Sequence, residues 1–146
     1  MNDGFTVSRV IKAPRELVWD AWTLPEHFSK WFGTEAVEVP LDSVVMDVRP
    51  GGKLAATMVF DDGNTMEWFG EYRLVDRPSR LEYVLSDGAP IEGIDPVVTT
   101  FTEVEGGTEV TLFQPRYGFT DEQMAATVIG YNSFFDALEN VVASIK

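Results

Sequence analysis

The middle of the chain alternates between apolar and polar residues, a period-two pattern that predicts half-buried β-strands. The pattern is clearest in "TMEWFGEYRLV", where one face carries Met66, Trp68, Gly70, Tyr72 and Leu74. Strands are predicted, from similar runs bounded by turn residues, at 5–13, 43–48, 53–60, 65–75, 81–86, 97–104 and 108–115.

Two short segments near the start repeat their apolar residues at helical spacing instead. In the first, Pro14 suits the first helical turn, and Leu17, Val18, Ala21 and Trp22 form one apolar face. In the second, Pro25 begins a helix that ends at Gly33, and its apolar residues are Phe28, Trp31 and Phe32.

The end of the chain predicts one long helix over residues 120–145. Thr120 and Gln123 have the spacing of a capping box. A single apolar stripe follows, made of Met124, Val128, Tyr131, Phe135, Leu138, Val142 and Ile145. Such a helix is about 38 Å long and must bury its stripe against a large apolar surface, which only the strands provide.

The order of these elements predicts an α+β fold in a single domain, residues 1–146. We expect a curled antiparallel sheet of about six to seven strands, with two short helices and the long C-terminal helix packed across it. Because a sheet of this extent curls and a helix is straight, the two separate over part of their length. A cavity lined by both is therefore expected, with the helix after Pro25 as a lid.

Composition and charge narrow the class of partner. The formal charge is −13 and the basic residues are scattered, which argues against a nucleic-acid binder and against an anionic membrane surface. There is no cysteine, no apolar run of membrane-spanning length and no apolar signal core at the start. We therefore expect a cytoplasmic protein, either a monomer or a homodimer, without disulfides.

Five motifs carry a resemblance to a known family: "IKAPRELVWDAWT", "WFG", "DVRPGGKL", "FGEYRLVDRPSRLEY" and "GGTEVTL". With the order of elements, they resemble the family named after the activator of the heat-shock chaperone ATPase. This family belongs to the START-like and birch-allergen-like helix-grip superfamily. The resemblance covers roughly residues 5 to 145 and implies a fold with an apolar cavity.

The chain departs from the family pattern at two positions. The family usually shows Gly-Trp in the last helix, where this chain has Gly130 and Tyr131, and many members have a histidine where this chain has Gln114. Members of the superfamily include lipid carriers, aromatase and cyclase enzymes, and chaperone regulators, so the fold alone does not select a function.

The row containing Trp68 and Tyr72 is the best candidate site. It is either core packed on the last helix, or the wall of a cavity completed by Phe60, by Phe101 or Phe113, and by Tyr131. The predicted ligand-binding residues are Trp31, Phe32, Phe60, Trp68, Tyr72, Phe101, Gln114, Val128, Tyr131 and Phe135. If buried, Gln114 and Tyr131 require hydrogen-bonding partners. An apolar pocket with a few polar groups is typical of small-molecule sites.

The sequence gives little support for a metal site, a cofactor site or a catalytic acid or base. His27 is the only histidine and is expected at the lid surface, so we predict no metal site and no cofactor. "DDGNTME" and "RPGGK" lack the spacing of calcium and phosphate loops and are predicted turns. Glu67 and Glu71 should face solvent. Glu92 and Asp95 lie in a loop expected near the cavity mouth, so they are the better candidates for a general acid or base if the protein is an enzyme.

Three classes of function follow from these observations. The leading one is binding of a small hydrophobic or aromatic ligand in the cavity, without cofactor. The second is a cyclase or dehydratase type of enzyme acting on a polyketide-like substrate. The third is a chaperone ATPase regulator or another protein-interaction module.

Overall fold

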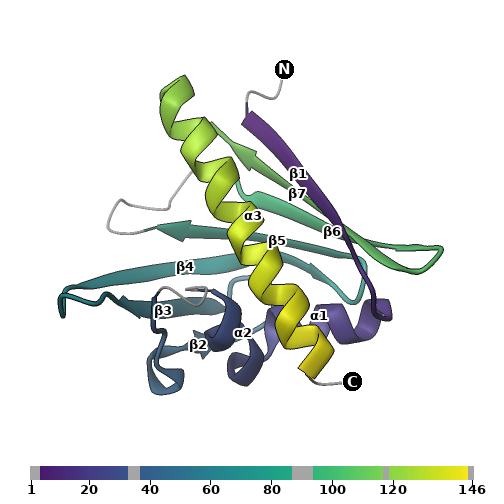
Figure 1. Ribbon diagram of the computed structural model, residues 1–146, viewed down its shortest axis with the longest axis horizontal. Helices are drawn as coiled ribbons and strands as arrows, with labels where there is room; N and C mark the ends of the chain where they lie inside the picture. The colour runs from purple at the N-terminus through teal and green to yellow at the C-terminus, as the bar shows by residue number, and fades with distance from the viewer. Residues whose placement is uncertain (1–3, 33–36, 87–93, 117–118, 145–146) are drawn as a thin grey trace.

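The computed structural model describes residues 4–32, 37–86, 94–116 and 119–144. A seven-stranded antiparallel sheet curls beneath a layer of helices (Figure 1). The strand order is β1-β7-β6-β5-β4-β3-β2. The strands are β1 (Gly4–Ile11), β2 (Val45–Met46), β3 (Lys53–Val59), β4 (Thr65–Asp76), β5 (Arg80–Ser86), β6 (Val97–Val104) and β7 (Gly107–Pro115).

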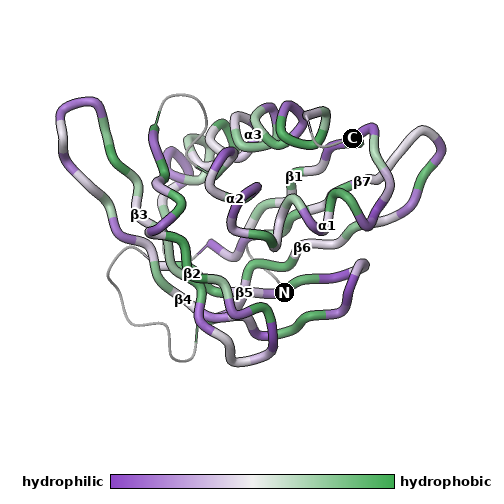
Figure 2. The backbone as a smooth tube through the Cα atoms, turned by 90° about the horizontal axis from the view of Figure 1, so that it is seen from below, coloured by the Kyte–Doolittle hydropathy of each residue, from purple (hydrophilic) through white to green (hydrophobic). Residues whose placement is uncertain are grey.

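Three α-helices lie on one face of this sheet: α1 (Arg15–Thr23), α2 (Pro25–Trp31) and α3 (Asp121–Ser144). A 3₁₀ turn, η1 (Leu41–Ser43), precedes β2. Seen from below, α3 runs above the sheet with α2 between the two layers (Figure 2). The predicted α+β helix-grip architecture, with two short helices and one long C-terminal helix, is confirmed.

The long helix begins where the capping residues predict. Thr120 Oγ1 accepts a hydrogen bond from the backbone N–H of Gln123 at 3.1 Å, and Gln123 Oε1 accepts one from the N–H of Thr120 at 2.8 Å. These two bonds satisfy donors that the first helical turn would otherwise leave unpaired. Along the helix, Phe135, Leu138 and Val142 are buried, whereas Val128 is only half-buried.

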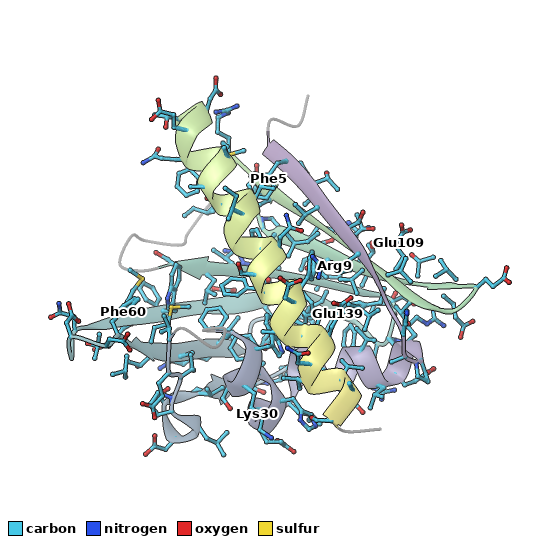
Figure 3. All side chains as sticks on the ribbon, viewed as in Figure 1. Phe5, Arg9, Lys30, Phe60, Glu109 and Glu139 are labelled. Carbon is cyan, nitrogen blue, oxygen red and sulfur yellow. The ribbon has the colours of Figure 1, made fainter. Side chains whose placement is uncertain are left out.

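Arg9 attaches the edge strand β1 to α3. Its guanidinium donates to Asp136 at 2.6 Å and to Glu139 at 3.3 Å, and it lies 5.6 Å from the ring centre of Phe135. Figure 3 shows Arg9 and Glu139 close together beside the axis of α3. Asp136 holds the pKa of Arg9 above its ordinary value by hydrogen bonding. The sequence did not indicate this contact between distant segments.

Two details of the helical and strand assignments differ from the prediction. Pro14 is the N-cap residue of α1 rather than part of its first turn. In β4, the pairing register shifts between Tyr72 and Leu74, which indicates a β-bulge. Val75 is therefore paired with the fully buried Leu81, and Leu74 leaves the inner row that strict alternation gave it.

Candidate functional site

A cavity of about 270 Å³ lies between the sheet and the helices. Its floor consists of inward-facing residues of neighbouring strands, including Leu54 and Met58 of β3 and Leu81 and Leu85 of β5. In Figure 2, α3 runs straight above the curled sheet, an arrangement in which helix and sheet diverge over part of their length.

Aromatic rings of α2 and α3 form the side of the cavity opposite the sheet. Phe28 and Phe32 stack with ring centres 4.6 Å apart, and Phe32 stacks on Phe134 of α3 at 5.7 Å. Phe32 also meets the ring of Trp68 edge-on at 6.1 Å. The indole N–H of Trp31 donates to the carbonyl of Ala21 at 2.8 Å, so this ring is fixed against α1. The lid predicted for the helix after Pro25 is thus in contact with both layers.

The cavity-facing side of α3 carries Thr127, Gly130, Tyr131, Phe134 and Phe135. Their spacing of three and four residues is that of one helical face. This face is rotated from the predicted stripe: it includes Phe134, whereas Val128 is not part of the lining. Sequence reasoning missed Phe134, although its place three residues after Tyr131 was the available signal.

One polar pair is built into the wall. The hydroxyl of Tyr131 donates a hydrogen bond of 2.5 Å to Oε1 of Gln114. Gln114 belongs to β7 and is only 6% exposed, whereas Tyr131 approaches it from α3. This hydrogen bond therefore joins β7 to α3 at the cavity wall.

Tyr72 is the second polar feature of the wall. It is 1% exposed and is paired in register with Tyr83 on β5, and its hydroxyl has no hydrogen-bond partner among the residues that the structure describes. Burial, with a smaller contribution from Tyr83, raises the pKa of Tyr72 above its ordinary value. The phenol is therefore neutral at physiological pH and does not serve as a base.

Gly70 lies where β4 and β5 come close together. A methyl group there would overlap the backbone carbonyl of Val84 on β5. Glycine at this position permits the close approach of the two strands.

Most of the predicted ligand-binding residues lie around the cavity. Its lining includes Trp31, Phe32, Trp68, Tyr72, Gln114, Tyr131 and Phe135. The lining also contains residues that the sequence reasoning did not select, among them Trp22, Met46 and Val97.

The structure places the other predicted site residues elsewhere. Phe60 lies one residue beyond β3, towards the tip of the β3–β4 hairpin (Figure 3). Phe101 is covered by Trp19 and Trp22 of α1, with ring centres 5.4 and 5.7 Å away. Val128 is outside the lining because of the rotation of α3.

The candidate acids and the histidine are not part of the described wall. His27 is half-buried and does not line the cavity. Glu67 is exposed, and Glu71 lies 3.3 Å from Arg73 in an ion pair. Asp95 is exposed, and Glu92 lies outside the described residues.

Neither a metal centre nor a membrane span is found in the part of the chain that the structure describes. No group of three or more His, Asp or Glu side chains is arranged to hold a metal ion there. No helix among the described ranges is both long and apolar enough to cross a bilayer.

Comparison with known proteins identifies the family. The family model described as Activator of Hsp90 ATPase homolog 1-like protein matches residues 12–143. The chain belongs to this family. Among curated proteins, no significant match to the chain was found.

Solved structures show the same fold as this member of the Activator of Hsp90 ATPase homolog 1-like family. An AHSA1-like protein from Aeromonas hydrophila is 24% identical, with a TM-score of 0.78 over 97% of this chain and 92% of that one. A protein from Staphylococcus epidermidis is 23% identical, with a TM-score of 0.81 over 100% and 93% of the two chains. A Rhodobacter sphaeroides protein is 19% identical, with a TM-score of 0.81 over 97% and 92%. At these identities the likeness concerns the fold.

Proposed function

We propose that this protein binds a small hydrophobic or aromatic molecule, without a cofactor, in the cavity between the sheet and α3. The observation that carries the proposal is the cavity of about 270 Å³ with predominantly apolar and aromatic walls. A cavity of about 150 Å³ already accommodates benzene, so a compound of two or three rings is the matching size.

The composition of the wall favours binding over catalysis. No Asp, Glu, His, Lys or Arg lies among the cavity-lining residues that the structure describes. General acid–base catalysis needs a titratable group near the substrate with a pKa close to the working pH. The buried phenol of Tyr72 does not meet this need, because its pKa is raised.

A thermal-shift screen of flat aromatic compounds, fatty acids and polyketide-like compounds tests the proposal. At a hundredfold excess over its dissociation constant, a ligand should stabilise the fold by about 2.7 kcal/mol. For a domain of this size, the melting temperature should rise by roughly 5–10 °C.

Two variants show whether a stabilising compound occupies this cavity. Trp68→Ala removes a ring from the wall, whereas Phe60→Ala removes a partly buried ring outside it. The ligand-induced shift should shrink in Trp68→Ala and persist in Phe60→Ala. The absence of any stabilising compound for the wild type, or equal loss in both variants, would contradict the proposal.

A further inference from the structure

The side-chain amide of Gln114 is held in place by a hydrogen bond at only one of its two ends. Its oxygen accepts the hydroxyl of Tyr131 at 2.5 Å, whereas its nitrogen makes no hydrogen bond among the described residues. The side chain is more than nine-tenths buried and lines the cavity. The Gln114 nitrogen is not among the fully buried side-chain atoms that lack a hydrogen-bond partner. Two N–H donors are therefore presented to the cavity.

The Tyr131 hydrogen bond determines which end of the amide is presented. Because the oxygen faces Tyr131, the NH₂ group is the free end. Packing of Phe5 against the ring of Tyr131, with centres 5.8 Å apart, fixes the tyrosine in turn. Tyr131 is thus a positioning residue, and Gln114 is the group that meets the ligand.

The cavity wall disfavours the binding of a charged ligand. The described lining contains no cationic side chain that could pair with a carboxylate, and no anionic one that could pair with an amine. An ion transferred into such surroundings loses its hydration without compensation. A free fatty acid or an aromatic carboxylate is therefore a poor occupant.

We propose that the ligand is an uncharged aromatic compound of two or three rings that carries a carbonyl-type oxygen, and that this oxygen accepts a hydrogen bond from the Gln114 amide. This inference rests on the proposed function and adds to it the chemical class of the ligand. The flat rings would lie between Trp68 on the sheet side and Phe134 on the helix side, both of which line the cavity.

Three probes of matched shape test the proposal by equilibrium dialysis. These are 2-acetylnaphthalene, 2-ethylnaphthalene, which lacks the oxygen, and 2-naphthoate, which is charged. Each is measured with the wild type, with Gln114→Met, and with Asn132→Leu, which removes an exposed amide of α3 as a control. The double variant Gln114→Met/Tyr131→Phe removes both partners of the hydrogen bond and guards against instability from an unpaired hydroxyl.

The quantity to compare between variants is the affinity for 2-acetylnaphthalene divided by the affinity for 2-ethylnaphthalene. Loss of one neutral hydrogen bond should lower this ratio by roughly 3- to 10-fold in Gln114→Met and in the double variant. Asn132→Leu should leave it within about twofold, the usual size of surface effects. The wild type should bind 2-naphthoate at least about 100-fold more weakly than 2-acetylnaphthalene, since the carboxylate would be buried unpaired.

The possible failures are distinguishable. If the ethyl compound binds and the ratio is the same in the wild type and in both Gln114 variants, the inference about Gln114 is overturned and the proposed function stands. Binding of 2-naphthoate as tight as that of the ketone overturns the selection against charge. If neither neutral compound binds the wild type, the proposed function itself fails, and the inference fails with it.

Discussion

Phe32 and Phe134 stack with ring centres 5.7 Å apart and planes at 17°, and this contact joins the end of α2 to the middle of α3. Both rings line the cavity. They are therefore at once part of the wall and part of the contact that fixes the short helix over the sheet.

A double-mutant cycle measures the strength of that contact. Phe32→Ala and Phe134→Ala should each destabilise the fold, and their coupling should be about 0.5–1.5 kcal/mol, as for other aromatic pairs. Urea unfolding gives the four free energies. Phe32→Ala combined with Ile129→Ala, at a position 69% exposed, should instead be additive within about 0.5 kcal/mol. Additivity of the Phe32 and Phe134 changes would show that the stacking contributes nothing beyond the burial of apolar surface area.

The face of α3 that packs on the core should be sensitive at Leu138, which is 0% exposed. Leu138→Ala should lower the free energy of unfolding by about 2–5 kcal/mol, because it leaves a cavity in close-packed surroundings. The control Ile129→Ala on the exposed side of the same helix should change it by less than about 0.5 kcal/mol. A Leu138 effect as small as that of the control would contradict the observed packing.

Two glycines should respond oppositely to the same change. At Gly130 in α3, an added methyl meets nothing within 4 Å, so Gly130→Ala should stabilise the helix by about 0.5–1 kcal/mol. Because Gly130 lines the cavity, the methyl should also reduce the affinity for the largest ligands. Gly70→Ala should destabilise by about 1–3 kcal/mol, since its methyl overlaps the backbone of β5. Thermal melting of both variants, with and without ligand, checks the signs.

The sequence predicts those features that depend on local pattern. The capping residues Thr120 and Gln123 mark the start of α3, and alternation around Trp68 and Tyr72 orients β4 correctly. Because these signals need only neighbouring residues, they also placed most of the cavity wall on the correct faces. Gln114 is buried and Tyr131 is half-buried, and the partner that each was expected to need if buried is the other.

What the sequence could not show depends on contacts between distant segments. The bulge beyond Tyr72 changes the face of Leu74, and nothing in the alternation indicates it. The rotation of α3 turns Phe134 rather than Val128 to the cavity, and it depends on how α3 meets distant elements such as β1 and α2, which it contacts. Phe101 was assigned to the correct face of the sheet, but the coverage by α1 was not predictable from periodicity.

The last prediction concerns the hydroxyl of Tyr72, which lacks a hydrogen-bond partner in the described part of the chain. A buried hydroxyl without a partner is unfavourable, so Tyr72→Phe should be neutral or stabilise the fold by up to about 1–2 kcal/mol. The pKa of Tyr72 is raised in the folded protein, so the folded state binds the phenolic proton more strongly than the unfolded state does. Stability from this group is therefore fully present below the unfolded pKa of about 10 and decreases as the pH rises above it.

Urea unfolding of the wild type and of Tyr72→Phe measures this effect between about pH 8 and 11, on both sides of the unfolded pKa. The wild type should lose stability above about pH 10 with an additional slope of at most about 1.4 kcal/mol per pH unit. The variant should lack that contribution, so the difference between the two proteins should grow with pH in favour of Tyr72→Phe. Parallel curves would show that the hydroxyl reaches solvent or a partner in solution, and a less stable variant at pH 8 would show that the hydroxyl is satisfied.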